Sequence, residues 1–79
     1  MYIKKTNPNT LQEIKISTEF IKLEAFLKFA GAVATGGEAK NLIQNGDVLV
    51  DGEVCTMRGK KIYPGMEVAM FGTTYKVGE

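Results

Sequence analysis

Two adjacent glycines, Gly36 and Gly37, open a stretch whose residue types suit the binding of an anion, TGGEAKNLIQNG from Thr35 to Gly46. Thr35 followed by Glu38 matches the S/T-x-x-E capping box, which makes the glycines the first two residues of a helix. The N–H groups of a first helical turn have no partner inside the helix, and that end carries partial positive charge. Because glycine has no side chain, another backbone can approach these N–H groups closely. The stretch therefore predicts a phosphate site, to which Lys40 adds a full positive charge one turn further on. A second explanation is that the glycines only relieve crowding in a tight turn between helices, and the residues alone do not decide between the two.

Other basic and polar residues are candidates for the same surface. Arg58, Lys60 and Lys61 cluster around Gly59 in MRGKKI, and they either extend a nucleic-acid surface or form a charged edge that discourages aggregation of sheets. The helix residues Lys28, Lys40, Asn41 and Gln44 either reach phosphates and sugar hydroxyls or are simply solvated. Since the net charge is only +1, the acidic residues are expected to lie largely away from the binding face: Glu13, Glu19, Asp47, Glu53, Glu67 and Glu79.

The composition argues against catalysis and metal binding. The chain has no His and a single Cys, Cys55, which removes the commonest general base and makes a zinc site or an intrachain disulfide untenable. We therefore expect no enzyme activity, no cofactor and no metal. The segment MYIKKTNPNT lacks the apolar run of a signal peptide, and no stretch approaches the length of a membrane span, so we expect a cytoplasmic protein without membrane contact.

Two helices are predicted to position the candidate residues. The first is expected over Thr18–Ala32, capped by Ser17 or Thr18 and ended by Gly31, with an apolar stripe of Phe20, Leu23, Phe26, Leu27 and Ala30. The second begins after Thr35, carries Ala39, Leu42 and Ile43 on one face, and ends at Asn45-Gly46. A linker of about three residues makes the helices a tight antiparallel or angled pair. Phe29 falls off the apolar stripe and is expected to pack elsewhere or lie partly exposed.

Strands and turns account for the rest of the chain. LQEIKIST alternates as a strand after a turn signal at Asn7–Asn9, and the residues beyond Gly46 form strands joined by turns at Asp51-Gly52, Pro64-Gly65 and Gly72-Thr73. Cys55 is expected in a strand as a small buried side chain, Phe71 in the core or at an edge, and Tyr63 beside Pro64 or stacked on a base. The order β-α-α-β-β-β-β predicts an α+β domain over residues 1–79, with two packed helices against a small, bent, mostly antiparallel sheet of about five strands.

The run KLEAFLKFAGAVATGGEAKNLIQNGDVLVDGEV, followed by RGKKIYPGMEV, resembles the RNA-binding domain named after ribosomal protein S-four, which contains the αL motif. The resemblance covers residues 21–68. Within the family, the chain looks most like the short stand-alone YaaA-like bacterial members. This resemblance implies binding of structured RNA by the helix pair. Lys22-Leu23-Glu24 stands where the family usually has Arg-Leu-Asp, Thr35 at its usual Ser/Thr, and Lys40 at the Arg/Lys of its second helix.

Two departures from the family pattern bear on affinity. Gly36 stands where many members carry Arg, and Lys22 replaces a planar guanidinium that binds phosphate through two hydrogen bonds. Backbone donors and point charges imply a modest affinity that depends on salt.

Two functions from different classes fit these residues. The first is a non-catalytic protein that binds structured RNA, ribosomal RNA above all, in ribosome assembly or translation quality control. The alternative is a protein–protein interaction module that docks through the helix pair or a sheet edge, and an exposed Phe29 or Met57 would favour it. In either case a monomer is expected.

Overall fold

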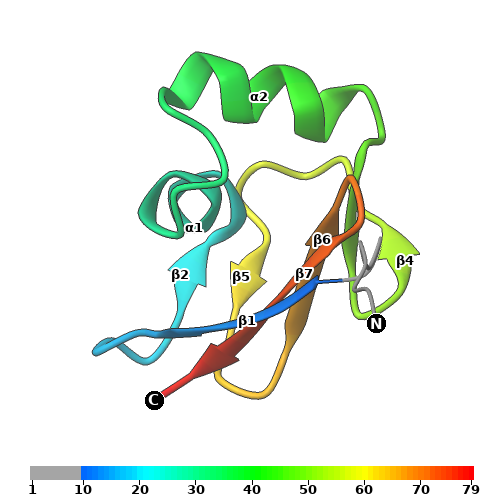
Figure 1. Cartoon of the computed structure of the whole chain (residues 1–79). Coiled ribbons are helices and arrows are strands. Elements are labelled where there is room, and N and C mark those ends of the chain that lie inside the picture. Colours follow the sequence, from blue (N-terminus) through cyan, green and yellow to red (C-terminus); the bar gives the residue numbers. More distant parts are fainter. Residues whose placement is uncertain (1–9) are drawn as a thin grey trace, which may run out of the picture.

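In the computed structural model, which describes residues 10–79, two helices lie on one side of a mixed five-stranded sheet, and two short strands pair beside them (Figure 1). The helices are α1 (Leu23–Phe29) and α2 (Gly36–Gln44), and the strands are β1 (Thr10–Lys15), β2 (Ile21–Lys22), β3 (Val48–Val50), β4 (Glu53–Val54), β5 (Lys61–Ile62), β6 (Glu67–Met70) and β7 (Thr73–Gly78). This architecture confirms the predicted α+β fold. The predicted turn at Asn7–Asn9 lies outside the described residues.

The main sheet has the strand order β1-β7-β6-β3-β4. Three neighbouring pairs are antiparallel, and β1 runs parallel to β7, with Thr10 opposite Thr73 and Lys15 opposite Gly78. A parallel pair needs a long connection, which the helices and the intervening strands supply. The sheet is thus mostly antiparallel, as predicted.

Helix α1 starts later than the sequence predicts. Residues Ile21 and Lys22 form the short strand β2, antiparallel to β5, and the helix begins at Leu23 with no side-chain cap. Instead, the N–H of Leu23 donates to the carbonyl of Lys60 at 2.8 Å, and the N–H of Glu24 donates to the carbonyl of Arg58 at 3.1 Å. The predicted start at Thr18 is wrong because a distant loop, rather than a local side chain, satisfies the first N–H groups.

Both helices end in a Schellman motif on a glycine, as predicted. Gly31 has φ +78° and donates to the carbonyl of Lys28, while Ala32 donates to Leu27. Gly46 has the same geometry, with φ +81°, and its N–H donates to the carbonyl of Ile43. The linker runs from Ala30 to Thr35, longer than expected, and the helices form the angled arrangement, with α1 seen end-on and α2 lying across the view in Figure 1.

Two-residue turns join β3 to β4 and β6 to β7. Asp51 and Gly52 both have positive φ, 51° and 87°, which is the signature of a type I′ turn. The second turn is one residue earlier than predicted: it consists of Phe71 (φ 50°) and Gly72 (φ 84°), and β7 already begins at Thr73. This shift explains why Phe71, expected in the core or at an edge, is 71% exposed.

The core lies between the helices and the sheet. Leu23, Phe26 and Leu27 from α1 are fully buried, as are Ala39 and Ile43 from α2. The Phe26 and Tyr75 rings meet edge-on, with centroids 6.2 Å apart. Cys55 corrects an expectation, because it follows β4 rather than lying in a strand and is only half-buried.

Candidate nucleic-acid interface

The start of α2 has the capping geometry that the sequence predicts. The N–H of Glu38 donates to Thr35 Oγ1 at 3.1 Å. The Glu38 carboxylate turns back and accepts from the N–H of Ala34 at 2.8 Å, one residue before the position expected for a capping box. The Glu38 carboxylate therefore lies beside the start of α2, where the backbone N–H of Ala34 holds it.

The two glycines at this helix end are open to solvent. A Cβ built on Gly36 or Gly37 would meet no atom within 4 Å, and neither residue has a positive φ. Within residues 10–79, no acceptor bonds to their N–H groups. Neither a tight turn nor a crowded contact requires glycine here, so the relief of crowding does not explain the pair.

One face of α2 carries the polar candidates. Gly37, Lys40, Asn41 and Gln44 follow the i, i+3, i+4, i+7 spacing and are all exposed, while Ala39 and Ile43 face the core. The helix thus presents a continuous polar row that begins at the open N-terminal turn.

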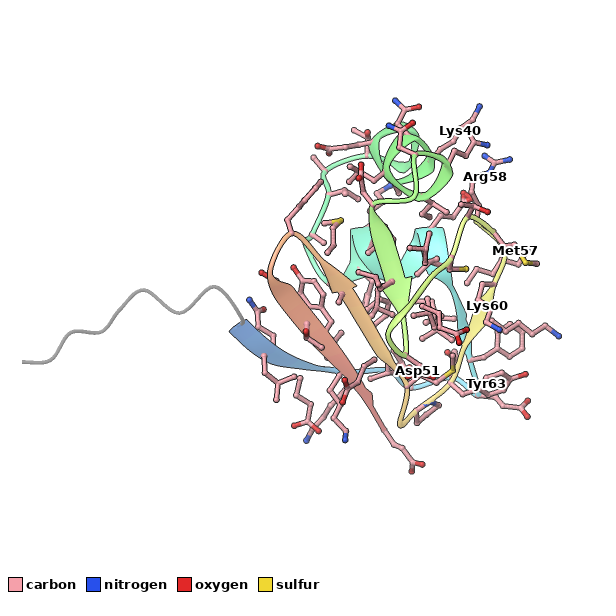
Figure 2. The ribbon with its side chains drawn as sticks, turned by 90° about the vertical axis from the view of Figure 1, so that its right-hand side faces the viewer. Lys40, Asp51, Met57, Arg58, Lys60 and Tyr63 are labelled. Carbon is pink, nitrogen blue, oxygen red and sulfur yellow. The ribbon has the colours of Figure 1, made fainter. Side chains whose placement is uncertain are left out.

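The loop between β4 and β5 lies beneath this helix in both views (Figures 1 and 2). Figure 2 shows Lys40 and Arg58 pointing outward at the same corner of the molecule. Because the carbonyls of Arg58 and Lys60 cap α1, the backbone of this loop is fixed to the start of that helix. We call Lys22, Lys40, Arg58, Lys60 and Lys61 the basic edge.

Two lysines of the basic edge lie directly opposite each other. Lys22 and Lys61 are register partners across the β2–β5 pair, and like charges in that arrangement are destabilising. The Lys61 ammonium lies 4.8 Å from the centroid of the Phe20 ring. The Phe20 and Tyr63 rings pack together, with their centroids 5.7 Å apart. The prediction that Phe20 belongs to the apolar stripe of the first helix is wrong, because Phe20 precedes β2, and no pattern in the sequence indicates its contact with Lys61. Tyr63 is 40% exposed.

Other candidates lie apart from the basic edge or differ from their expected place. Lys28 is exposed in the last turn of α1, about 9 Å along the helix from Lys22. Glu53 was expected away from the binding face, but it lines a pocket together with Lys60 and Met57. Phe29 and Met57 are exposed, at 61% and 65% of their surfaces.

Within residues 10–79, no group of three or more His, Cys, Asp or Glu side chains is arranged to hold a metal ion. In the same part of the chain, neither helix has the length and apolar character needed to cross a membrane.

Comparison with known proteins shows which family the chain belongs to. A probable ribosome maturation protein of Bacillus subtilis (strain 168), RlbA, is 42% identical over 62 residues, which cover 76% of this chain and 87% of the relative. The solution structure of YbcJ from E. coli, described as revealing an αL motif involved in RNA binding, superposes with a TM-score of 0.66. That match has 29% identity and covers 100% of this chain and 98% of YbcJ. The model of the S4 domain family matches residues 14–78, beyond both ends of the 21–68 resemblance, and the chain therefore belongs to the S4 domain family.

Proposed function

We propose that this chain is a non-catalytic protein that binds structured RNA, specifically ribosomal RNA, and acts in the cytoplasm in ribosome assembly or translation quality control. All of residues 1–79 would form one RNA-binding domain. The observation that carries the proposal is the open N-terminal turn of α2, followed one turn on by Lys40, which points outward at the same corner of the molecule as Arg58. The ribosome maturation role named for RlbA and the RNA-binding αL motif of YbcJ support the same assignment.

In the proposed complex, a ribose-phosphate strand passes along the exposed face of α2. The N–H groups of Gly36 and Gly37 donate to a phosphate, with Thr35 fixing the helix end, and Lys40 and Arg58 pair with phosphates further along. Asn41 and Gln44 reach sugar hydroxyls or phosphates, and Lys28 extends the surface along α1. Such contacts read the shape and backbone of a folded RNA more than its sequence.

The Lys22–Lys61 pair supports an anionic partner. Lysines at opposite register positions of a strand pair repel, and a phosphate bound near both would turn a destabilising pair into a stabilising one. Lys60, in the loop that precedes β5, provides a further positive charge. The basic edge thus contains five cations, although the net charge of the whole chain is only +1.

The test is crosslinking in cells followed by sequencing of the bound RNA. Lys40→Glu is expected to reduce recovered ribosomal RNA about tenfold, because hydrogen bonds to charged groups contribute roughly 1.5–3 kcal/mol each. Lys15→Glu is the matched control, since Lys15 is an exposed lysine on β1, away from α2. Equal recovery of the same RNA by the wild type and Lys40→Glu would exclude this face.

A second candidate function is a protein-interaction module, which the exposure of Phe29 and Met57 favours. Salt separates the two functions. RNA affinity should fall by roughly 0.7–0.9 log units per log unit of salt for each phosphate neutralised, whereas an apolar interface should barely respond.

A further inference from the structure

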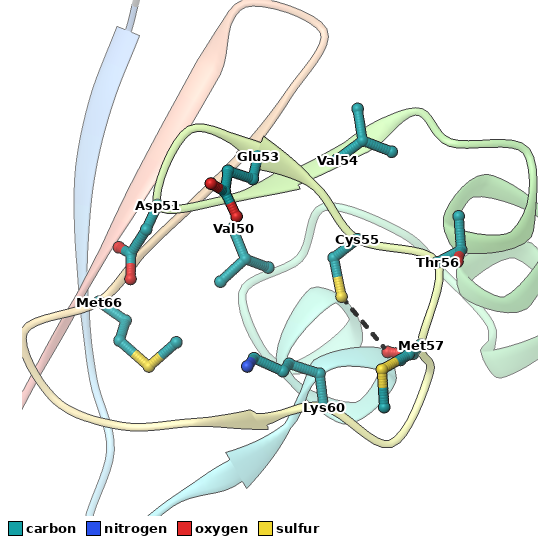
Figure 3. Close-up of a pocket in the computed structure, with 9 residues that line it drawn as sticks. All are labelled: Val50, Asp51, Glu53, Val54, Cys55, Thr56, Met57, Lys60 and Met66. Carbon is teal, nitrogen blue, oxygen red and sulfur yellow. Dashed lines mark hydrogen bonds between the residues drawn. The ribbon is translucent and has the colours of Figure 1, made fainter.

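A pocket of about 360 Å³ opens beside the basic edge, between the β3–β4 turn and the loop that precedes β5. Its size is within the range of small-molecule sites, roughly 300–1,000 Å³. Figure 3 shows the side chains of Val50 and Met66 on its walls, and Asp51, Glu53 and Lys60 around it. In Figure 2, Asp51, Met57 and Lys60 lie on the same side of the molecule as Arg58. A group bound in the pocket would therefore adjoin RNA held by the basic edge.

Two of the polar groups in the pocket already have partners. Asp51 Oδ1 accepts from the N–H of Glu67 at 2.9 Å, and the Cys55 thiol donates to the carbonyl of Met57 at 3.8 Å. Within residues 10–79, neither the Glu53 carboxylate nor the Lys60 ammonium forms a hydrogen bond, and both are exposed. The pocket thus offers a ligand the Glu53 carboxylate and the Lys60 ammonium, and Asp51 adds a second carboxylate.

This combination suits a nucleobase better than a phosphate. Two carboxylates against one ammonium repel an anion, while apolar walls that include a flexible Met accommodate a flat ring. Proteins commonly recognise RNA bases that are unstacked from loops and bulges, by contacts to the faces and polar edges of the base. The RNA backbone would stay on the basic edge while one base enters the pocket.

All four bases have a donor and an acceptor on the Watson–Crick edge, but guanine alone offers a carboxylate two adjacent N–H donors. Its Watson–Crick edge has two adjacent N–H donors, N1 and N2, which a carboxylate can accept together, followed by the O6 acceptor. The Glu53 carboxylate has the chemistry to accept from N1 and N2, and the Lys60 ammonium has the chemistry to donate to O6. Resting on the proposed RNA-binding function, we propose that this pocket receives an unpaired guanine that projects from the bound RNA.

The experiment measures the affinity of the full chain for a set of synthetic RNA hairpins by fluorescence anisotropy. The hairpins share one stem and carry a single bulged G, A, C or U, or no bulge. We expect about tenfold tighter binding of the bulged-G hairpin, because a bidentate contact to a base contributes about 1–3 kcal/mol of discrimination. Glu53→Gln should lower this preference to twofold or less. Glu13→Gln is the matched control, since Glu13 is an exposed carboxylate on β1.

The outcomes separate this inference from the function on which it rests. Equal, salt-dependent binding of all hairpins would overturn the guanine pocket and leave RNA binding intact. A Glu53→Gln variant that tightens binding to every hairpin equally would overturn it too, because Glu53 would then act only by repelling phosphates. If no hairpin binds at any salt concentration, the proposed function fails and the pocket proposal fails with it. The comparison among wild-type affinities stands even if a variant does not fold.

Discussion

At the scale of single residues, Gly36 and Gly37 carry the argument for a ligand. Their φ values and surroundings would accept a side chain, so the fold itself does not need glycine at either position. Glycine in a helix is less favourable than alanine, because glycine has more conformational freedom in the unfolded chain and loses it on folding. A pair of glycines that stability does not require is consistent with a close approach by another backbone.

Gly37→Ala separates stability from binding. We expect the free energy of unfolding, measured by urea denaturation, to rise by roughly 0.4–1 kcal/mol. RNA affinity should fall severalfold, because the new methyl group would stand where the ribose-phosphate strand approaches. Gly36→Ala, made in parallel, should behave in the same way. A variant that is more stable and binds RNA as tightly as the wild type would show that the glycines serve no close contact.

The sequence predicted residue contacts where they are local and missed them where they are not. The capping pair of Thr35 and Glu38 is three residues apart, and its spacing alone indicates the bond. Lys61 and Phe20 are brought together by the β2–β5 pairing, which the sequence does not show, because two-residue strands leave no alternating pattern.

At the scale of helices and strands, the ends were more predictable than the starts. Gly31 and Gly46 end both helices because a left-handed residue closes the last turn by itself. The start of α1 depends on the carbonyls of Arg58 and Lys60, which are more than thirty positions further along the chain. The spacing of apolar residues contains no trace of these bonds, and it therefore predicts a start at Thr18 instead of Leu23. The same tertiary cap fixes the loop that carries much of the basic edge.

The β3–β4 turn allows a prediction about strand pairing. Gly52→Ala should destabilise the protein by about 1–2 kcal/mol, since Gly52 has φ +87°, a conformation that costs other residues roughly this much. Urea denaturation would measure the change. Gly59→Ala is the control, because a Cβ at either glycine meets no atom within 4 Å and only Gly52 has a positive φ. An equal effect of the two substitutions would show that the turn conformation does not limit stability.

At the scale of the whole molecule, the placement of charge matters more than its sum. The net charge of +1 gives little indication of a nucleic-acid-binding protein, yet Lys22, Lys40, Arg58 and Lys61 come from α2, the β2–β5 pair and the adjoining loop. The sequence predicted these residues as candidates, but the pocket with Asp51 and Glu53 beside them was not foreseen. Its walls come from segments whose proximity depends on the folded sheet.

The most direct test of the RNA-binding surface is chemical-shift mapping of the isotope-labelled chain, titrated with a synthetic copy of the RNA segment recovered by crosslinking. We expect the largest changes at the backbone amides of Gly36, Gly37, Lys40 and Arg58. Changes confined to β1 and β7, with these four amides unmoved, would contradict the proposal that α2 and the basic edge bind the RNA.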